Sequence, residues 1–335
     1  MVIHAALDDR LLRVRKTDGG WRAEETLVGH DVECLAADGD RVFAGTAEAG
    51  LQHSPDGGDT WRAVDIEHRV TSVTVGPDGT VWVGTEPSAV YRAPGGDLDA
   101  LAACADLTAL PDSDRWSFPP RPHTHQVRWI AVASDDPDRL YVAIEAGAFI
   151  RSTDGGERWE PHPKGARRDA HTVATHPEAP ERVYVAAGDG YAESSDRGAS
   201  WRYPQEGLEH RYVWGLAVDP GDPDRVVVSA ARGAGSAHRP ANAETYVYRR
   251  GGGTSDTDTG GTDVEGGDWH LAMDGFPGPE GTVRAVLAAG KSGEFYALTN
   301  RGLSRSRDAG RSWAALPVEW PASYTRQVGH GLAVV

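Results

Sequence analysis

The chain has 335 residues, of which 39% are hydrophobic and 25% are charged, with a formal net charge of −16. This composition is typical of a soluble globular protein, and the length allows one large all-β domain with a substantial core. Diffuse negative charge argues against a nucleic acid partner, because phosphate binding needs a basic surface. We expect no membrane association, since no run of 18 apolar residues occurs.

The N-terminal segment lacks the basic start and apolar stretch of a signal peptide, so we expect a cytoplasmic protein. We also expect a monomer. Acidic residues outnumber basic ones by 50 to 34, and lysine occurs only as Lys16, Lys164 and Lys291. This bias predicts a halophilic protein whose charge concerns hydration rather than function. The two cysteines, Cys34 and Cys104, are expected to be buried free thiols.

Short apolar strands recur along the chain, and a turn rich in Asp, Gly or Pro and a second strand follow each of the middle five. The seven first strands are expected at 32–37, 70–75, 127–132, 171–176, 213–218, 283–288 and 328–334. Each unit has room for four antiparallel strands. The repeat predicts an all-β, seven-bladed β-propeller that forms a single domain over residues 1–335.

The seventh unit is divided between the two ends of the chain. Residues 326–335 carry its first strand, and the N-terminal residues 2–25 would supply the other three. We therefore expect the N-terminal strands to pair with the C-terminal strand. Such a closure removes open sheet edges.

An octet of the pattern Ser-x-Asp-x-Gly-x-x-Trp occurs four times, beginning at Ser54, Ser152, Ser194 and Ser306. In each copy the aspartate can accept backbone N–H bonds within a turn, the glycine permits a left-handed backbone angle, and the tryptophan can pack between blades. We interpret the octets as structural. Their aspartates are not expected to be catalytic.

These octets resemble the Asp-box, or BNR, repeats of sialidase-like propellers. Segments 116–159 and 167–201 are similar more narrowly to uncharacterised bacterial and archaeal BNR-repeat proteins with a glycosyl hydrolase-like character. The resemblance implies a β-propeller. It implies no particular activity, because enzymes and purely binding proteins share the repeat.

Two insertions interrupt the pattern. Residues 105–124 lengthen the link between the second and third blades and are interpreted as a lid or pocket wall. Residues 250–268 replace the octet of the fifth blade with a Gly, Asp and Thr-rich segment, to which we assign no function.

Large polar and ionisable residues fall at one register position of the innermost strands, where a structural channel would use small or apolar ones. This position holds Glu33, Thr71, Arg128, His171, Trp214, Arg284 and His330. The adjoining loops add Arg69, His125, Asp169, Arg211, Glu145 and Asp189. Burying several ionisable groups without partners is costly, so this set predicts a ligand in the central channel.

Three uses of this set remain open. The favoured one is binding of a small polar, anionic or carbohydrate ligand, with a non-catalytic protein-interaction scaffold as the alternative. A glycoside hydrolase-like enzyme would draw on Glu145, Asp169, Asp189 and His171 as catalytic candidates. A true sialidase is not expected, because the arginine motif near the N-terminus is absent and Tyr212 is the nearest candidate tyrosine.

The third use is a metal on the ring axis, held by His171 and His330 with His125, His68 or His210 above them. No cofactor and no metal ligand is assigned from the sequence. The remaining channel residues are predicted to bind the ligand: Glu33, Arg69, His125, Arg128, Arg211, Trp214, Arg284 and His330.

Overall fold

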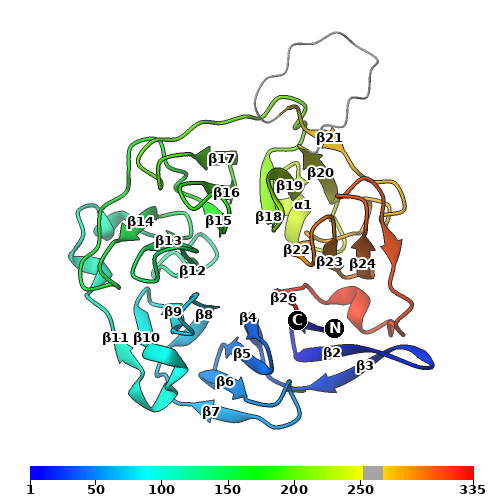
Figure 1. The fold of residues 1–335 in the computed structure, drawn as a ribbon, viewed down its shortest axis with the longest axis horizontal. Coiled ribbons are helices and arrows are strands. Elements are labelled where there is room, and N and C mark those ends of the chain that lie inside the picture. The colour runs from blue at the N-terminus through cyan, green and yellow to red at the C-terminus, as the bar shows by residue number, and fades with distance from the viewer. Residues whose placement is uncertain (252–266) are drawn as a thin grey trace.

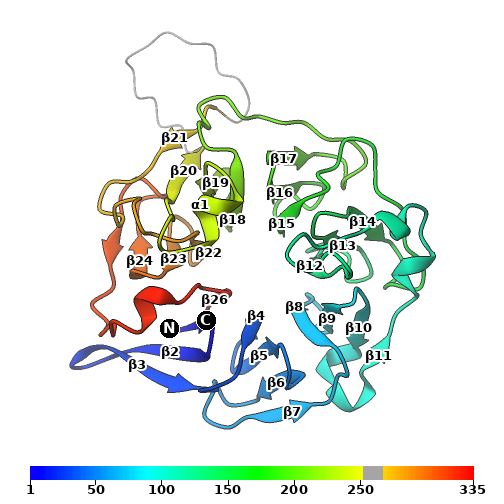
Figure 2. The same ribbon diagram turned by 180° about the vertical axis from the view of Figure 1, so that it is seen from behind.

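A computed structural model describes residues 1–251 and 267–335, and the greater part of the second insertion lies outside these ranges. The chain forms seven antiparallel sheets arranged as blades around a central axis (Figure 1). Figure 2 shows the same ring from behind, with the blades in sequence order around it. The predicted seven-bladed β-propeller is therefore confirmed.

Each blade runs outward from the axis, with its first strand innermost. Blades one to four comprise β4 (Val32–Asp38), β5 (Arg41–Thr46), β6 (Leu51–Ser54) and β7 (Arg62–Val64); β8 (Arg69–Val75), β9 (Val81–Glu86), β10 (Val90–Ala93) and β11 (Ala102–Ala103); β12 (Val127–Val132), β13 (Leu140–Ile144) and β14 (Ala148–Ser152); and β15 (Ala170–Thr175), β16 (Val183–Ala187) and β17 (Gly190–Ser194).

Blades five to seven complete the ring. They comprise β18 (Tyr212–Asp219), β19 (Asp222–Ala231), β20 (Tyr246–Arg250) and β21 (His270–Leu271); β22 (Val286–Ala289), β23 (Phe295–Thr299), β24 (Gly302–Ser306) and β25 (Ala314–Ala315); and β26 (Gly331–Val334), β1 (Val2–Leu7), β2 (Arg10–Thr17) and β3 (Gly20–Thr26).

Helices are few and short among the described residues. The α-helix α1 (Ala234–His238) follows β19, and there are five 3-10 helices: η1 (Pro94–Gly96), η2 (Leu98–Ala100), η3 (Leu107–Ala109), η4 (Ser113–Arg115) and η5 (Tyr324–Arg326). No helix in the described ranges is long and apolar enough to cross a membrane.

Strand lengths differ from the expectation in two places. In blades three and four the outermost strand is reduced to single bridges, Arg151 with Glu160 and Glu193 with Arg202. The innermost strands of blades six and seven begin at Val286 and Gly331, three residues later than predicted. In blade six the preceding residues instead bond to the α1 region, since the Arg284 N–H donates to the Ala237 carbonyl.

The ring closes as predicted, with β1 pairing to β26 on one side and β2 on the other. The core lies between neighbouring blades, where apolar side chains of one sheet pack on the next. One such cluster joins Ile3, Leu12, Tyr296 and Leu298 of blades six and seven.

The octets form the turns between the third and fourth strands. In each copy the serine Oγ donates to the aspartate Oδ1 and accepts the N–H of the glycine, and that aspartate oxygen accepts the N–H four residues on. The four glycines, Gly58, Gly156, Gly198 and Gly310, have φ between 79° and 94°. These contacts stabilise a turn and leave the aspartates no part in a common site.

Candidate functional site

A cavity of about 670 Å³ opens at the mouth of the channel, on the side of the loops that enter the innermost strands. Its lining includes predicted channel residues, part of the first insertion and α1. The lining residues are Glu33, Phe118, Pro119, Pro120, Arg121, Gln126, Arg128, Glu145, Asp169, Tyr212, Trp214, Ala234, Gly235, His238, Arg239, Arg284 and His330. A second cavity of about 310 Å³, lined largely by apolar residues of the innermost strands, lies deeper in the channel.

β-Bulges explain why large side chains occupy this position. In blades one to five the pairing of the first two strands shifts register, and the residue left out of the pairing is in turn Glu33, Thr71, Arg128, His171 and Trp214, together with Gly215 in blade five. A bulge re-aims a side chain and is common beside functional sites. The alignment that singled out these residues therefore coincides with a real irregularity of the sheet.

Two arginines approach the indole ring of Trp214. The guanidinium carbon of Arg284 is 4.0 Å from the centre of the indole ring and that of Arg128 is 4.7 Å from it. Both arginines are buried, with relative exposures of 5% and 8%. Each gains a cation–π contact that is stronger away from water.

Neither arginine has a bonded carboxylate among the described residues. Arg284 donates from Nε to His238 Nδ1 at 3.0 Å and from Nη1 to the Gly329 carbonyl at 2.7 Å, both neutral acceptors. The Nε of Arg128 has no hydrogen-bond partner in the described part of the chain, and its nearest carboxylate oxygen, on Glu145, is 4.0 Å away. Burial beside Arg128 lowers the pKa of Arg284 to about 9.

Tyr212 and His238 extend this arrangement. Because His238 Nδ1 accepts from Arg284, the neutral ring carries its hydrogen on Nε2, which lies 2.9 Å from the Tyr212 hydroxyl. Burial, together with the charge of Arg284, lowers the pKa of His238 to about 2, so the ring stays neutral. Tyr212 can then donate its own proton into the cavity.

Glu145, Asp169 and His171 form a compact cluster at the cavity wall. One donor atom from each lies within 4.8 Å of the others, and His171 Nε2 is 3.7 Å from Asp169 Oδ1. Burial raises the pKa of both carboxyl groups and lowers the pKa of His171 to about 3. Of the four predicted catalytic candidates, the structure brings these three together and leaves Asp189 outside.

Glu33 lines the cavity and forms an ion pair with Arg69, which does not line it. Arg121, a lining residue, donates from Nε to Glu86 at 2.6 Å. Arg121 belongs to the first insertion, which also contributes Phe118, Pro119 and Pro120 to the cavity lining. Part of the expected pocket wall is thus present.

Four of the predicted site residues lie outside the cavity or are bonded to residues other than a ligand. Asp189 is exposed and pairs with Arg167 at 2.7 Å, and Arg211 is exposed; neither lines the cavity. His125 accepts the Ser88 N–H through Nδ1 at 3.3 Å and packs on the edge of Trp116. His330 lines the cavity, but its Nε2 bonds to Asp8 at 2.8 Å.

Several lining residues were missed by sequence reasoning. His238 comes from the turn after the second strand of blade five, which folds into α1 instead of a tight loop. Gln126 precedes the innermost strand of blade three and donates to Glu145 at 2.5 Å. Tyr212 was noted only as the nearest tyrosine. The length of segment 232–245 was the one available signal for His238.

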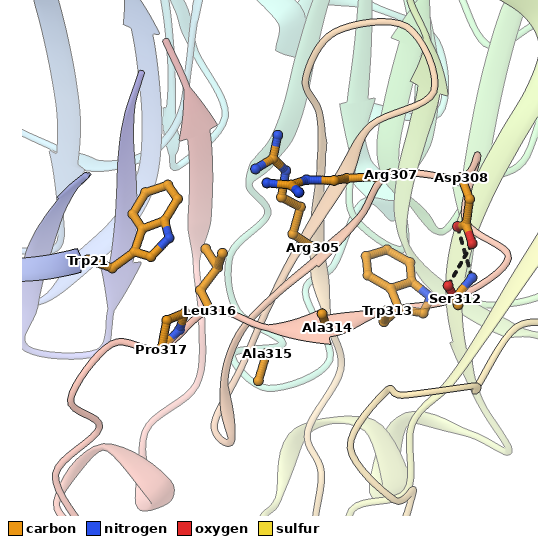
Figure 3. Close-up of a pocket in the computed structure, with 10 residues that line it drawn as sticks. All are labelled: Trp21, Arg305, Arg307, Asp308, Ser312, Trp313, Ala314, Ala315, Leu316 and Pro317. Atoms are coloured by element: carbon orange, nitrogen blue, oxygen red, sulfur yellow. Dashed lines mark hydrogen bonds between the residues drawn. The ribbon is translucent and has the colours of Figure 1, made fainter. Parts of the chain in front are cut away.

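A further pocket of about 330 Å³ lies at the octet of blade six (Figure 3). Trp21 and Arg305 flank it, and the octet residues Asp308, Ser312 and Trp313 line its other side. Because Asp308 already accepts the Ser312 hydroxyl at 2.6 Å, these groups are engaged in the turn. We do not assign a ligand there.

No family model matches the sequence, and no curated protein matches it either. Solved structures share the fold at low identity. The "Niastella koreensis GH74 (NkGH74) enzyme" has a TM-score of 0.62 at 15% identity, over 84% of this chain and 46% of that one. "YCF48 from Cyanidioschyzon merolae" has a TM-score of 0.57 at 13% identity, over 85% and 84%.

The "WD40 beta propeller domain of Doa1" has a TM-score of 0.59 at 11% identity, over 92% of this chain and 90% of that one. The chain thus covers less than half of the first GH74 enzyme, and 36% of a second, described as an ancestral GH74 enzyme. At these identities the likeness concerns the fold alone.

Proposed function

We propose that the channel mouth binds a small hydroxylated carboxylate, such as a sugar acid. The observation that carries this proposal is the pair of buried guanidinium groups, Arg128 and Arg284, that share Trp214 and have no bonded carboxylate among the described residues. A buried guanidinium that donates no hydrogen bond to a carboxylate is costly, and a bound oxyanion would supply such an acceptor.

The rest of the cavity suits the remainder of such a ligand. Glu145 and Asp169 can accept hydrogen bonds from ligand hydroxyls, and the ring of Tyr212 can pack on an apolar ring face. The volume of about 670 Å³ is within the usual range for small-ligand sites. The octets support, in addition, an affiliation with Asp-box propellers.

Glycoside hydrolysis is a second candidate, favoured by the proximity of Glu145 and Asp169 and by the GH74 enzymes that share the fold. Release of reducing sugar that is lost in both Glu145→Gln and Asp169→Asn would support it. A protein-binding scaffold is favoured by the structure entitled "YCF48 bound to D1 peptide". Within the described residues, however, the exposed large hydrophobic residues are few: Met1, Val28, Tyr203, Leu271 and Val335.

The proposal is tested by thermal unfolding in EDTA with a matched ligand pair, glucuronate and glucose, which differ in one carboxylate. A ligand at 100 times its Kd stabilises the native state by about 2.7 kcal/mol. We expect glucuronate to raise the Tm of the wild type and of Arg211→Met, whose arginine is exposed outside the cavity. Arg128→Met should lose the effect. Equal shifts in both variants, or none with any sugar acid, would contradict the proposal.

A further inference from the structure

The cluster of Glu145, Asp169 and His171 combines the donor types of a transition-metal site. Imidazole nitrogen and carboxylate oxygen together suit ions such as Zn²⁺ and Mn²⁺. His171 belongs to β15 of blade four, Asp169 directly precedes this strand, and Glu145 directly follows β13 of blade three. Neighbouring blades thus fix them on a rigid frame.

His171 is the observation that distinguishes this cluster from a mere group of acids. Its Nδ1 lies 2.8 Å from the Val213 carbonyl, which can only accept, so Nδ1 carries the hydrogen. Nε2 therefore presents a lone pair. This atom has no hydrogen-bond partner among the described residues, although the side chain is 1% exposed, and it faces Asp169 Oδ1 at 3.7 Å.

The carboxylates also have the outer contacts that metal ligands typically have. Asp169 Oδ1 accepts the Ala146 N–H at 3.1 Å, and Glu145 Oε2 accepts from Gln126 at 2.5 Å. Such contacts, like the Val213 carbonyl on His171, orient ligands before the ion arrives. Donors bound to one ion at about 2.1 Å lie at most about 4.2 Å apart, so the cluster would contract by several tenths of an ångström.

We propose that Glu145, Asp169 and His171 bind one divalent first-row transition-metal ion at the wall of the channel-mouth cavity. The two carboxylates balance the charge of the ion. Three protein ligands leave at least one coordination position, and Glu145 and Asp169 line the cavity, so that position faces it. The inference does not rest on the proposed carboxylate ligand, because only these three side chains are needed.

Calorimetric titration of the EDTA-treated and then desalted full chain with ZnCl₂ or MnCl₂ tests this inference. We expect one site in the wild type, with Mg²⁺ at least tenfold weaker because imidazole prefers transition metals. Asp169→Asn and His171→Gln should weaken that site at least about tenfold. Asp189→Asn, at an exposed position outside the cavity, and His270→Gln, at an exposed position of β21, are matched controls and should bind as the wild type does.

The side chain of Asp169 is 38% exposed, so the Asp169→Asn variant should fold. If circular dichroism shows that His171→Gln is unstable, the titration of Asp169→Asn decides between the outcomes. The same affinity and stoichiometry in Asp169→Asn and wild type would overturn the proposal. So would the absence of Zn²⁺ and Mn²⁺ binding at millimolar concentration, or Mg²⁺ binding as tight as that of Zn²⁺. Glucuronate binding is measured in EDTA, which removes divalent metal ions, so none of these metal-binding results changes the outcome of that test.

Discussion

Arg284 and Trp214 lie face to face at the channel mouth, with the guanidinium carbon 4.0 Å from the centre of the indole ring. The hydrogen bonds of Arg284 go to an imidazole and a backbone carbonyl, not to an acid. Arg128 approaches the same indole at 4.7 Å. Two buried arginines therefore share one indole at the channel mouth of a protein whose net charge is −16.

Arg128→Met should cost the ligand-free protein little. Its Nε has no hydrogen-bond partner in the described chain and the Glu145 carboxylate is 4.0 Å away, so methionine removes a weakly paired charge while keeping much of the volume. We expect a free energy of unfolding within about 1 kcal/mol of the wild-type value, or above it. Urea denaturation at pH 7 measures this.

Arg250→Met is the matched contrast. Arg250 is also buried but is bonded to Glu193, which forms a second ion pair with Arg202 at 2.8 Å. Breaking such a pair leaves a buried charge and costs about 3–5 kcal/mol. Similar losses in Arg128→Met and Arg250→Met would show that Arg128 is a structural residue.

Ser194→Ala should destabilise the blade-four octet. The buried Ser194 Oγ donates to Asp196 at 2.8 Å and accepts the Gly198 N–H at 2.8 Å, so alanine leaves a buried N–H without a partner. We expect a loss of about 1–3 kcal/mol in unfolding free energy. Ser200→Ala, at the exposed end of the same octet, is the control and should lose less. Equal losses would contradict this structural role.

His4 should make the protein sensitive to acid. Burial, with the charge of Arg13 beside it, lowers the pKa of His4 to about 4 from an ordinary value of 6.5, and neither ring nitrogen has a partner among the described residues. The unfolded chain takes up this proton first as the pH falls. Stability is therefore complete above pH 6.5 and is lost between pH 6.5 and about 4, by roughly 3 kcal/mol in all.

His4→Leu removes this proton linkage and provides the measurement. The unfolding free energy of wild type should fall more steeply than that of the variant between pH 6.5 and 4.5, by about 1.4 kcal/mol per pH unit at most. Parallel curves for the two proteins would mean that His4 does not titrate on unfolding.

The fold could be predicted from the sequence because each blade repeats similar short sequence patterns. Apolar strands, Asp-Gly turns and the octet hydrogen bonds all act within a few residues, as the Ser54, Asp56 and Gly58 contacts illustrate. The channel position was also found, because the bulges at Glu33, Arg128 and His171 fall at one register.

The detailed site was less accessible, because it depends on loops whose paths are set by tertiary contacts. His238 reaches Arg284 only because segment 232–245 forms α1, and no periodic pattern marks that turn. Asp169 and Asp189 were both catalytic candidates in the sequence, yet Asp189 is exposed and paired with Arg167. The spacing of residues in the sequence predicts where a side chain lies along a strand, but it does not predict which residue that side chain contacts.

The most direct test of the central claim is a crystal structure of the protein with glucuronate. The account predicts the carboxylate at the channel mouth, within hydrogen-bond distance of Arg128 or Arg284, with the sugar ring beside Trp214 or Tyr212. Glucuronate bound only at another place, such as Arg305 and Arg307 of the blade-six pocket, would contradict it. So would a channel mouth without ligand at saturating glucuronate.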